Sequence, residues 1–191
     1  MALEPELSRL SLTLVLVLGL SLGACDRGER EAAQESTATP APTGDIDRSN
    51  AGALMPAINV TDPAGRTLNL GALQGQPVLL NLWATWCAPC VKEMPLLDEL
   101  AGDYEGRLKV LTVSQDMQGA AKVEPFFAAG GYEALEPWMD VQGELGFALG
   151  GGVMPTTVLY DASRQEVWRV AGDYDWSGED ARAAIEAAIA E

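Results

Sequence analysis

Two cysteines separated by two residues are the feature of this sequence that most directly predicts chemistry. Cys87 and Cys90 stand in the stretch WATWCAPC, and the chain has one further cysteine, Cys25, and no histidine. A tetrahedral zinc site needs four ligands, usually Cys or His, so this pair would need carboxylates or a second chain to complete one. Without histidine the C-x-x-C-H haem attachment is also excluded. A structural disulfide here would close a very short loop with little entropic benefit. The residues favour a redox-active dithiol, and we expect no metal and no cofactor beyond it.

The local structure predicts different tasks for the two thiols. The nearly continuous apolar run 77–83 is typical of a buried strand, and the apolar spacing of 88–104 predicts a helix. The strand therefore delivers Cys87 to the first turn of the helix, where unpaired N–H groups and the helix dipole favour a thiolate. Cys87 is the predicted attacking thiol. Cys90 lies about one turn further on the more buried side, so it is the predicted resolving thiol.

Strands and helices alternate along the rest of the chain, which predicts a mixed α/β fold with helices on both faces of a central sheet. The predicted elements are an opening hairpin at 58–60 and 67–70, a strand at 108–113, a helix at 119–129, a short strand at 138–139, a short helix at 141–149, a hairpin of strands 156–160 and 166–170, and a last helix that ends at residue 190. Ser177 is the predicted N-cap of that last helix.

The segment VLLNLWATWCAPCVKEMP, residues 78–95, resembles the active-site segment of the thioredoxin superfamily. Within that superfamily it is similar to the membrane-tethered TlpA/ResA/CcmG group of extracytoplasmic thiol-disulfide oxidoreductases, and the similarity extends more loosely over residues 54–191. It implies a thioredoxin-like fold with a central mixed β-sheet flanked by helices, an N-terminal β-hairpin and a central α/β insertion. Pro95 matches the kink-forming proline of the active-site helix.

The resemblance also implies a proton-transfer residue beside the thiols. Thioredoxin carries a buried aspartate where this chain has Asn81. Glu93 follows Cys90 by three residues on the same helical face and matches a buried glutamate of the ResA/CcmG group. Judged by residue type alone, Glu93 would be a solvated surface carboxylate. The resemblance implies instead that Glu93 handles protons near Cys90.

A second segment, Val153-Met154-Pro155-Thr156, matches the cis proline that lies against the disulfide in thioredoxin-like proteins. By itself such a proline could also simply start a strand. The resemblance implies that substrate contacts Met154 and the residues around the thiols, which are Trp86, Ala88 and Pro89. Trp83 and Trp86 are expected to lie half in the core and half at the surface, with Trp86 the more exposed of the two.

The amino terminus predicts export and a lipid anchor. The apolar run 10–20 is too short for a comfortable membrane span and has the length of a signal-peptide core. It ends in Leu-Gly-Ala-Cys25, which resembles the lipoprotein box, so Cys25 is the predicted lipidation site. An uncleaved anchor helix is the alternative, because the first nine residues carry little positive charge. The predicted organisation is a signal peptide at 1–24, a flexible tether at 25–53 and a thioredoxin-like domain at 54–191.

Charge and resemblance together narrow the predicted partners. With 12 basic and 28 acidic residues the formal net charge is −16, which disfavours binding to nucleic acid. The resemblance implies a periplasmic protein-disulfide reductase on the inner membrane, supplied by a membrane thiol reductant of the DsbD/CcdA type. Its implied clients are apocytochrome c, the proteins that handle it, or copper-delivery proteins. The alternatives are a peroxiredoxin-like thiol peroxidase and a non-enzymatic Cu(I)-binding assembly factor.

Overall fold

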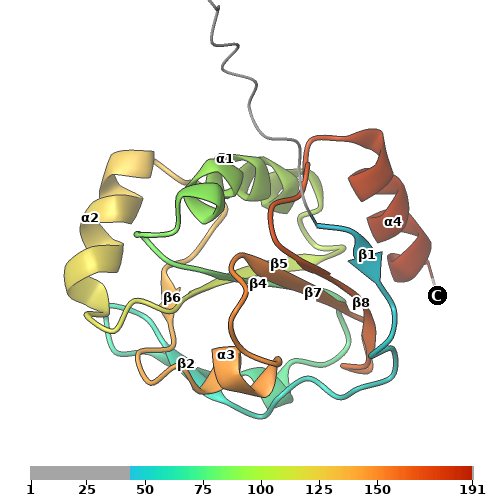
Figure 1. The fold of residues 1–191 in the computed structure, drawn as a ribbon, viewed down its shortest axis with the longest axis horizontal. Coiled ribbons are helices and arrows are strands. Elements are labelled where there is room, and N and C mark those ends of the chain that lie inside the picture. Colours follow the sequence, from blue (N-terminus) through green and yellow to red (C-terminus); the bar gives the residue numbers. More distant parts are fainter. Residues whose placement is uncertain (1–43, 191) are drawn as a thin grey trace, which may run out of the picture. The chain divides into compact units, whose positions relative to one another are not determined.

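One mixed sheet of eight strands organises residues 44–190, the part of the chain that the structure, a computed structural model, describes (Figure 1). The strand order across the sheet is β1-β8-β7-β4-β5-β6-β2-β3. The strands are β1 (Ile46–Asp47), β2 (Asn59–Thr61), β3 (Thr67–Asn69), β4 (Val78–Trp83), β5 (Lys109–Ser114), β6 (Trp138–Met139), β7 (Thr156–Tyr160) and β8 (Glu166–Ala171). Strands β4, β5 and β6 run parallel, and every other neighbouring pair is antiparallel.

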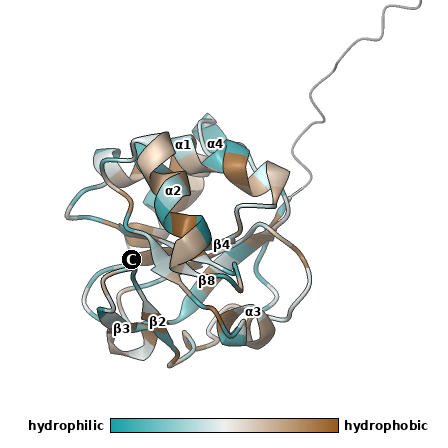
Figure 2. Cartoon of the chain, turned by 90° about the vertical axis from the view of Figure 1, so that its left-hand side faces the viewer, coloured by the Kyte–Doolittle hydropathy of each residue, from teal (hydrophilic) through white to brown (hydrophobic). Residues whose placement is uncertain are grey.

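The helices cover both faces of the sheet, although unequally. Helices α1 (Ala88–Asp103), α2 (Ala120–Gly130) and α4 (Glu179–Ile189) lie on one face, and the short helix α3 (Glu144–Ala148) lies on the other with the β2–β3 hairpin (Figures 1 and 2). The 3₁₀ turn η1 (Leu70–Ala72) follows that hairpin. Among residues 44–190 no helix has the length and apolar character needed to cross a membrane. The predicted fold class, including the hairpin and the α2–β6–α3 insertion, is confirmed.

Strand β4 lies at the centre of the sheet and divides the core in two. All six of its residues are buried, as the continuous apolar run predicted. Because side chains alternate along a strand, Leu79 and Trp83 pack with α1, α2 and α4, whereas Leu80 and Leu82 pack with α3 and η1. The buried face of α1 is thereby fixed against β4, and this packing holds the beginning of α1 at the end of the strand.

The folded domain begins earlier than predicted. The tether was expected to reach residue 53, but β1 pairs with β8, where Ile46 lies opposite Val170. Further along, the amide of Gly52 donates to the carbonyl of Glu166, and the amide of Glu166 donates to the carbonyl of Ala53. Residues 44–53 therefore belong to the domain edge. The predicted signal peptide, Cys25 and the tether up to residue 43 lie outside the described residues.

The prediction for the start of α4 was wrong. Ser177 was expected to cap this helix, yet the cap residue is Gly178, which has no side chain to do so. The hydroxyl of Ser177 instead donates to the carboxylate of Asp175, 2.5 Å away. Asp175 also accepts from the backbone amide of Ser177. A short Asp–Ser turn therefore precedes the helix, and this local bonding competes with capping for the same hydroxyl.

Candidate active site

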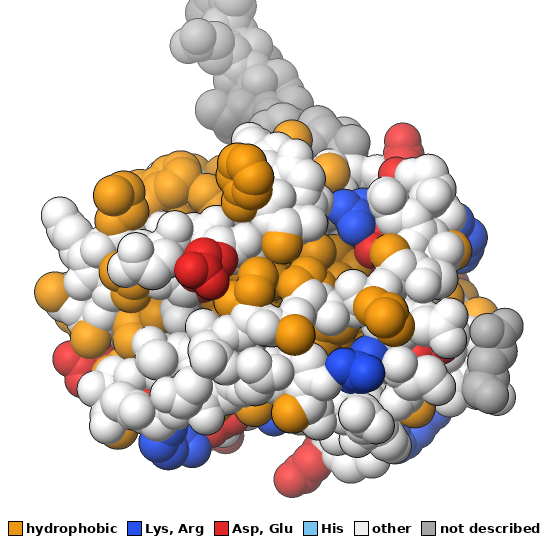
Figure 3. Space-filling view, turned by 90° about the horizontal axis from the view of Figure 1, so that it is seen from below, with side chains coloured by type: hydrophobic (Ala, Val, Ile, Leu, Met, Phe, Trp, Pro, Cys, Tyr) orange, Lys and Arg blue, Asp and Glu red, His pale blue; other side chains and the backbone are white. Residues whose placement is uncertain are grey.

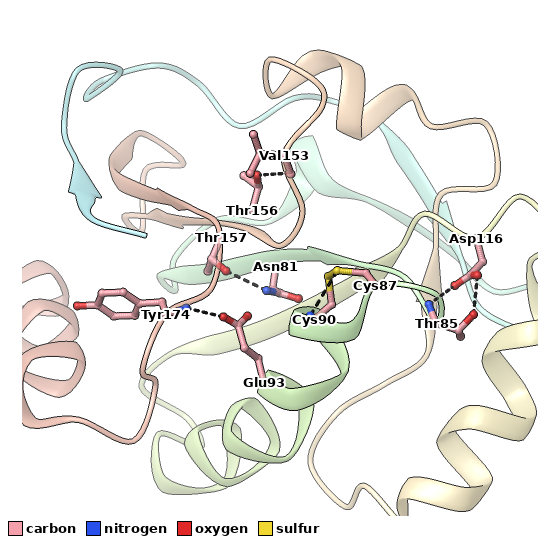
Figure 4. The surroundings of a disulfide bond; sticks show 10 residues. All are labelled: Asn81, Thr85, Cys87, Cys90, Glu93, Asp116, Val153, Thr156, Thr157 and Tyr174. Carbon is pink, nitrogen blue, oxygen red and sulfur yellow. Dashed lines mark hydrogen bonds between the residues drawn. A yellow bond between two sulfur atoms is a disulfide. The ribbon is translucent and has the colours of Figure 1, made fainter. Parts of the chain in front are cut away.

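Cys87 and Cys90 form a disulfide at the first turn of α1 (Figure 4). Cys87 is the N-cap residue, and its sulfur accepts a hydrogen bond from the amide of Cys90 at 3.3 Å. The exposed fraction of Cys87 is 6% and that of Cys90 is 1%. Cys87 is thus the more accessible sulfur, as predicted, although it is less exposed than a surface thiol. In the dithiol form the same N–H group and the helix N-terminus would stabilise a thiolate at Cys87.

A buried carboxylate holds the turn that leads into Cys87. Asp116 lies just beyond the end of β5, is 3% exposed, and accepts hydrogen bonds from the amide and the hydroxyl of Thr85 at 2.9 and 2.8 Å. It also accepts from the hydroxyl of Ser114 at 2.8 Å. Sequence reasoning missed this residue. Because β4 and β5 are parallel neighbours, their carboxyl ends meet at one sheet edge, which brings Asp116 to the active-site turn.

Glu93 lies buried one turn after Cys90, with an exposed fraction of 2%. One carboxylate oxygen accepts from the backbone amide of Tyr174 at 2.7 Å, as Figure 4 shows, while the other has no hydrogen-bond partner of normal geometry. Burial raises the pKa of Glu93 from 4.5 to about 8, opposed by the Tyr174 amide and the nearby Trp176 indole and reinforced by Asp173. The solvated alternative for Glu93 is therefore excluded.

Asn81 is a second buried polar residue near the disulfide (Figure 4), and it lies on β4. It projects from β4 and its amide nitrogen donates to the hydroxyl of Thr157 on β7 at 2.9 Å, whereas its amide oxygen has no partner. The Asn81 side chain does not titrate, so it cannot replace a carboxylate as a proton carrier. Glu93 is consequently the buried titratable carboxylate that the structure places on the same helical face as Cys90.

The predicted substrate-contact residues are accessible to different degrees. The Met154–Pro155 peptide bond is cis, as the resemblance implied, and Pro155 is buried while Met154 is half-buried. Ala88 is exposed, Pro89 is half-buried, and Trp86 has an exposed fraction of 68%. The expectation for Trp83 was wrong, because this residue is fully buried beneath Phe126, with ring centroids 4.8 Å apart. The roles of the accessible residues in binding substrate stay predictions.

Metal ligands are not assembled in the described part of the chain. Residues 44–190 contain no group of three or more His, Cys, Asp or Glu side chains placed to hold an ion. The redox-active atoms of the site are the sulfurs of Cys87 and Cys90, which are bonded to each other. Breaking and re-forming this bond by exchange with another dithiol requires only a thiolate, an accessible sulfur and a proton carrier.

Comparison with known proteins agrees with this chemistry. The sequence model of the AhpC/TSA family matches residues 51–186. The thiol-disulfide oxidoreductase ResA of Bacillus thuringiensis (strain Al Hakam) is 31% identical over 133 residues, covering 68% of this chain and 74% of that protein. ResA of Geobacillus thermodenitrificans is 34% identical over 111 residues, covering 58% of this chain and 63% of that protein.

Solved structures give the same answer for the fold. A crystal structure from Chlorobium tepidum, assigned as a thiol:disulfide interchange protein DsbE, superposes with a TM-score of 0.64 at 25% identity, covering 73% of this chain and 97% of that one. The StoA structure from Bacillus subtilis, at 23% identity and a TM-score of 0.55, shares the fold over 64% of this chain and 95% of that one. The chain therefore belongs to the AhpC/TSA family of the thioredoxin superfamily and is a thiol-disulfide oxidoreductase whose redox group is the Cys87–Cys90 pair.

Proposed function

We propose that the chain reduces disulfides of other proteins outside the cytoplasm. The observation that carries the proposal is the buried Glu93 carboxyl on the helical face of Cys90, because its pKa of about 8 lies close to that of an ordinary thiol. A carboxyl matched in this way can exchange a proton with Cys90 at little free-energy cost, and its ionised form, whose share grows as the pH rises toward 8, accepts the Cys90 proton. The more exposed Cys87, at the helix N-terminus, supplies the attacking sulfur.

The proposed reaction has two steps and transfers two electrons to the client. The Cys87 thiolate attacks one sulfur of the client disulfide, forms a mixed disulfide and releases a client thiolate. Cys90 then gives its proton to Glu93 and attacks the Cys87 sulfur, which re-forms the Cys87–Cys90 disulfide and releases the second client thiolate. Protonation of the two client thiolates completes the client dithiol, and a dithiol donor must afterwards reduce the Cys87–Cys90 bond.

The finer parts of the proposal concern the location and the partners. Lipidation at Cys25 would hold the domain on the periplasmic side of the inner membrane, where a membrane thiol reductant of the DsbD/CcdA type could recharge it. The proposed clients are apocytochrome c, the proteins that handle it, or copper-delivery proteins of oxidase assembly. The similarity to ResA proteins supports this class of activity, and the short apolar run before Cys25 supports export.

A trapping experiment tests the proposal. Cys90→Ser removes the resolving thiol, so a client captured on Cys87 should persist as a mixed disulfide that is visible on non-reducing gels and identifiable by mass spectrometry. The Cys87→Ser, Cys90→Ser double variant is the control, since it offers no attacking sulfur. The proposal fails if no Cys87-dependent adduct forms and the reduced protein reduces no protein disulfide. Rapid hydroperoxide consumption would favour the peroxidase alternative, and tight Cu(I) binding without reduction would favour the assembly factor.

A further inference from the structure

A cavity of about 400 Å³ opens between Trp86 and Met154, on the face of the sheet that α3 covers. It meets the active site through two residues, because Trp86 precedes Cys87 in the chain and Met154 precedes the cis proline. The size is within the range of roughly 300–1,000 Å³ that is typical of ligand pockets. Figure 3 looks onto this side of the domain and shows hydrophobic side chains across its middle, with few charged ones among them. The side chains that line the cavity and carry the argument are those of Leu82, Trp86, Gln115, Leu149, Met154 and Arg169.

Hydrogen bonds hold the outer wall of the cavity in place. Asp140 accepts from the amide of Leu145 at 2.8 Å and so secures the beginning of α3. The amide of Gly151 donates to the carbonyl of Gly146 at 2.9 Å, and the hydroxyl of Thr156 donates to the carbonyl of Val153 at 2.7 Å. The glycine-rich segment between α3 and β7 is therefore tied at both ends. The cavity is formed before any ligand arrives, which lowers the entropic cost of filling it.

The lining chemistry favours an uncharged, apolar occupant. The guanidinium of Arg169 already donates to both carboxylate oxygens of Glu166, at 2.6 Å each, and to the carbonyl of Leu149 at 2.8 Å. The amide nitrogen of Gln115 is buried as well, and its side-chain oxygen is the atom that faces Gly146. No acidic side chain lines the cavity, and Arg169 is already paired with Glu166, so a Lys or Arg of the client would find no partner for its charge there.

Gly146 determines whether the cavity is open. A Cβ atom added there would lie 2.9 Å from the Gln115 side-chain oxygen and 3.9 Å from Leu82. Gly146 lies within α3 and does not have a positive φ, so its backbone conformation is also allowed for residues with larger side chains. The space beside Gln115 therefore exists because position 146 has no side chain.

We infer that this cavity is a specificity pocket that receives a large apolar side chain of the client, close in sequence to the client's reacting cysteine. Trp86 and Met154 border the path from the pocket to Cys87. The inference rests on the proposed function, since it concerns the polypeptide that Cys87 attacks. It predicts that clients are chosen by an aromatic or a large aliphatic residue beside the cysteine.

The test uses short peptides whose single cysteine carries a chromogenic thiol as a mixed disulfide, with each flanking position changed in turn to Phe, Leu, Ala or Lys. Rates with the reduced protein are divided by its rate with hydroxyethyl disulfide, which is too small to fill the pocket. At one flanking position Phe or Leu should raise kcat/KM at least about tenfold over Ala, because the apolar side chain is buried there, and Lys should give no gain.

Two variants test the pocket itself. Gly146→Leu should reduce the ratio of the Phe rate to the Ala rate to about one, because its side chain fills the space. Gln115→Glu keeps the size of the side chain but adds a negative charge at the pocket wall, so it should lower the ratio of the Phe rate to the Ala rate several-fold. The matched control is Gly102→Leu, a glycine of α1 with open space around it and no contact with the cavity, which should keep the full preference.

Binding is measured separately from reduction. The oxidised protein is titrated with the preferred peptide in which Ser replaces Cys, and the amide signals of Gly146 and Gly150–Gly152 and the side-chain amide of Gln115 should shift. If every peptide is reduced at the same rate, or if Gly146→Leu keeps the preference, the pocket assignment is overturned. If neither peptides nor hydroxyethyl disulfide are reduced, the proposed function fails, and the titration alone then decides whether the pocket binds the peptide.

Discussion

Replacing Glu93 by Gln should remove a pH dependence of stability that this carboxyl imposes. The pKa of Glu93 is raised from 4.5 to about 8 by burial, so between these values the folded protein holds a proton that the unfolded chain has released. Stability therefore falls as the pH rises through this window. The pKa difference, 8 − 4.5 = 3.5, corresponds at most to about 5 kcal/mol at about 1.4 kcal/mol per pKa unit. Between pH 5 and pH 7.5 the part lost is about 3 kcal/mol.

The assay is denaturant unfolding of the disulfide form at a series of pH values, so that thiol ionisation does not contribute. The wild type should lose about 3 kcal/mol relative to Glu93→Gln between pH 5 and pH 7.5. The amide oxygen of Gln can still accept from Tyr174, so the variant should fold. Glu124→Gln on α2, an exposed carboxylate, is the control for the change in net charge and should follow the wild type. Equal pH slopes for the wild type and Glu93→Gln would refute the assignment of a raised pKa.

Three further predictions concern the reactive turn and the amino terminus. In the reduced protein at neutral pH, Cys87 should be alkylated at least about tenfold faster than Cys90, as read by peptide mass mapping; equal rates would remove the assignment of Cys87 as attacking thiol. Asp116→Ala should lower the free energy of unfolding by about 2–4 kcal/mol, because buried donors lose a charged acceptor, whereas Thr85→Val should cost about 1 kcal/mol; a smaller loss for Asp116→Ala would contradict the proposed clamp. Cys25→Ser should abolish lipidation, and an unchanged mass and detergent partitioning would show that another segment anchors the chain.

The parts of the site that depend on local pattern could be predicted from the sequence. The apolar run of β4 and the apolar spacing of α1 placed Cys87 at a helix start, and the structure has α1 beginning at Ala88. The burial of Glu93 could not be inferred in this way. Spacing puts Glu93 on the face of Cys90, but the segment that covers this face, at Tyr174, lies 81 residues further along the chain. The burial of Glu93 was predicted only through the resemblance to the ResA/CcmG group.

The features that were missed depend on tertiary contacts or on competing short-range bonds. Strand β1 has only two residues, too few for any periodicity, and exists because the edge of β8 offers it hydrogen-bond partners. In the sequence, nothing distinguishes Asp116 from any other aspartate that follows a strand. Only the parallel pairing of β4 and β5 brings its carboxylate to Thr85. Ser177 satisfies the usual preference for an N-cap, yet Asp175 competes for its hydroxyl.

Because the disulfide spans only a short segment, the difference in thermal stability between the oxidised and the reduced domain reports the reduction potential of the site. Cys87 and Cys90 are three residues apart, so the bond restricts the unfolded chain very little. A thermodynamic cycle then equates the stability difference between the oxidised and reduced domains with the difference between the reduction potentials of the folded site and an unfolded dithiol. About 1.4 kcal/mol corresponds to about 30 mV for this two-electron couple. A domain whose folded site has a lower potential than an unfolded dithiol, which favours giving electrons, unfolds at a higher temperature when oxidised, and a domain whose site has a higher potential does the opposite.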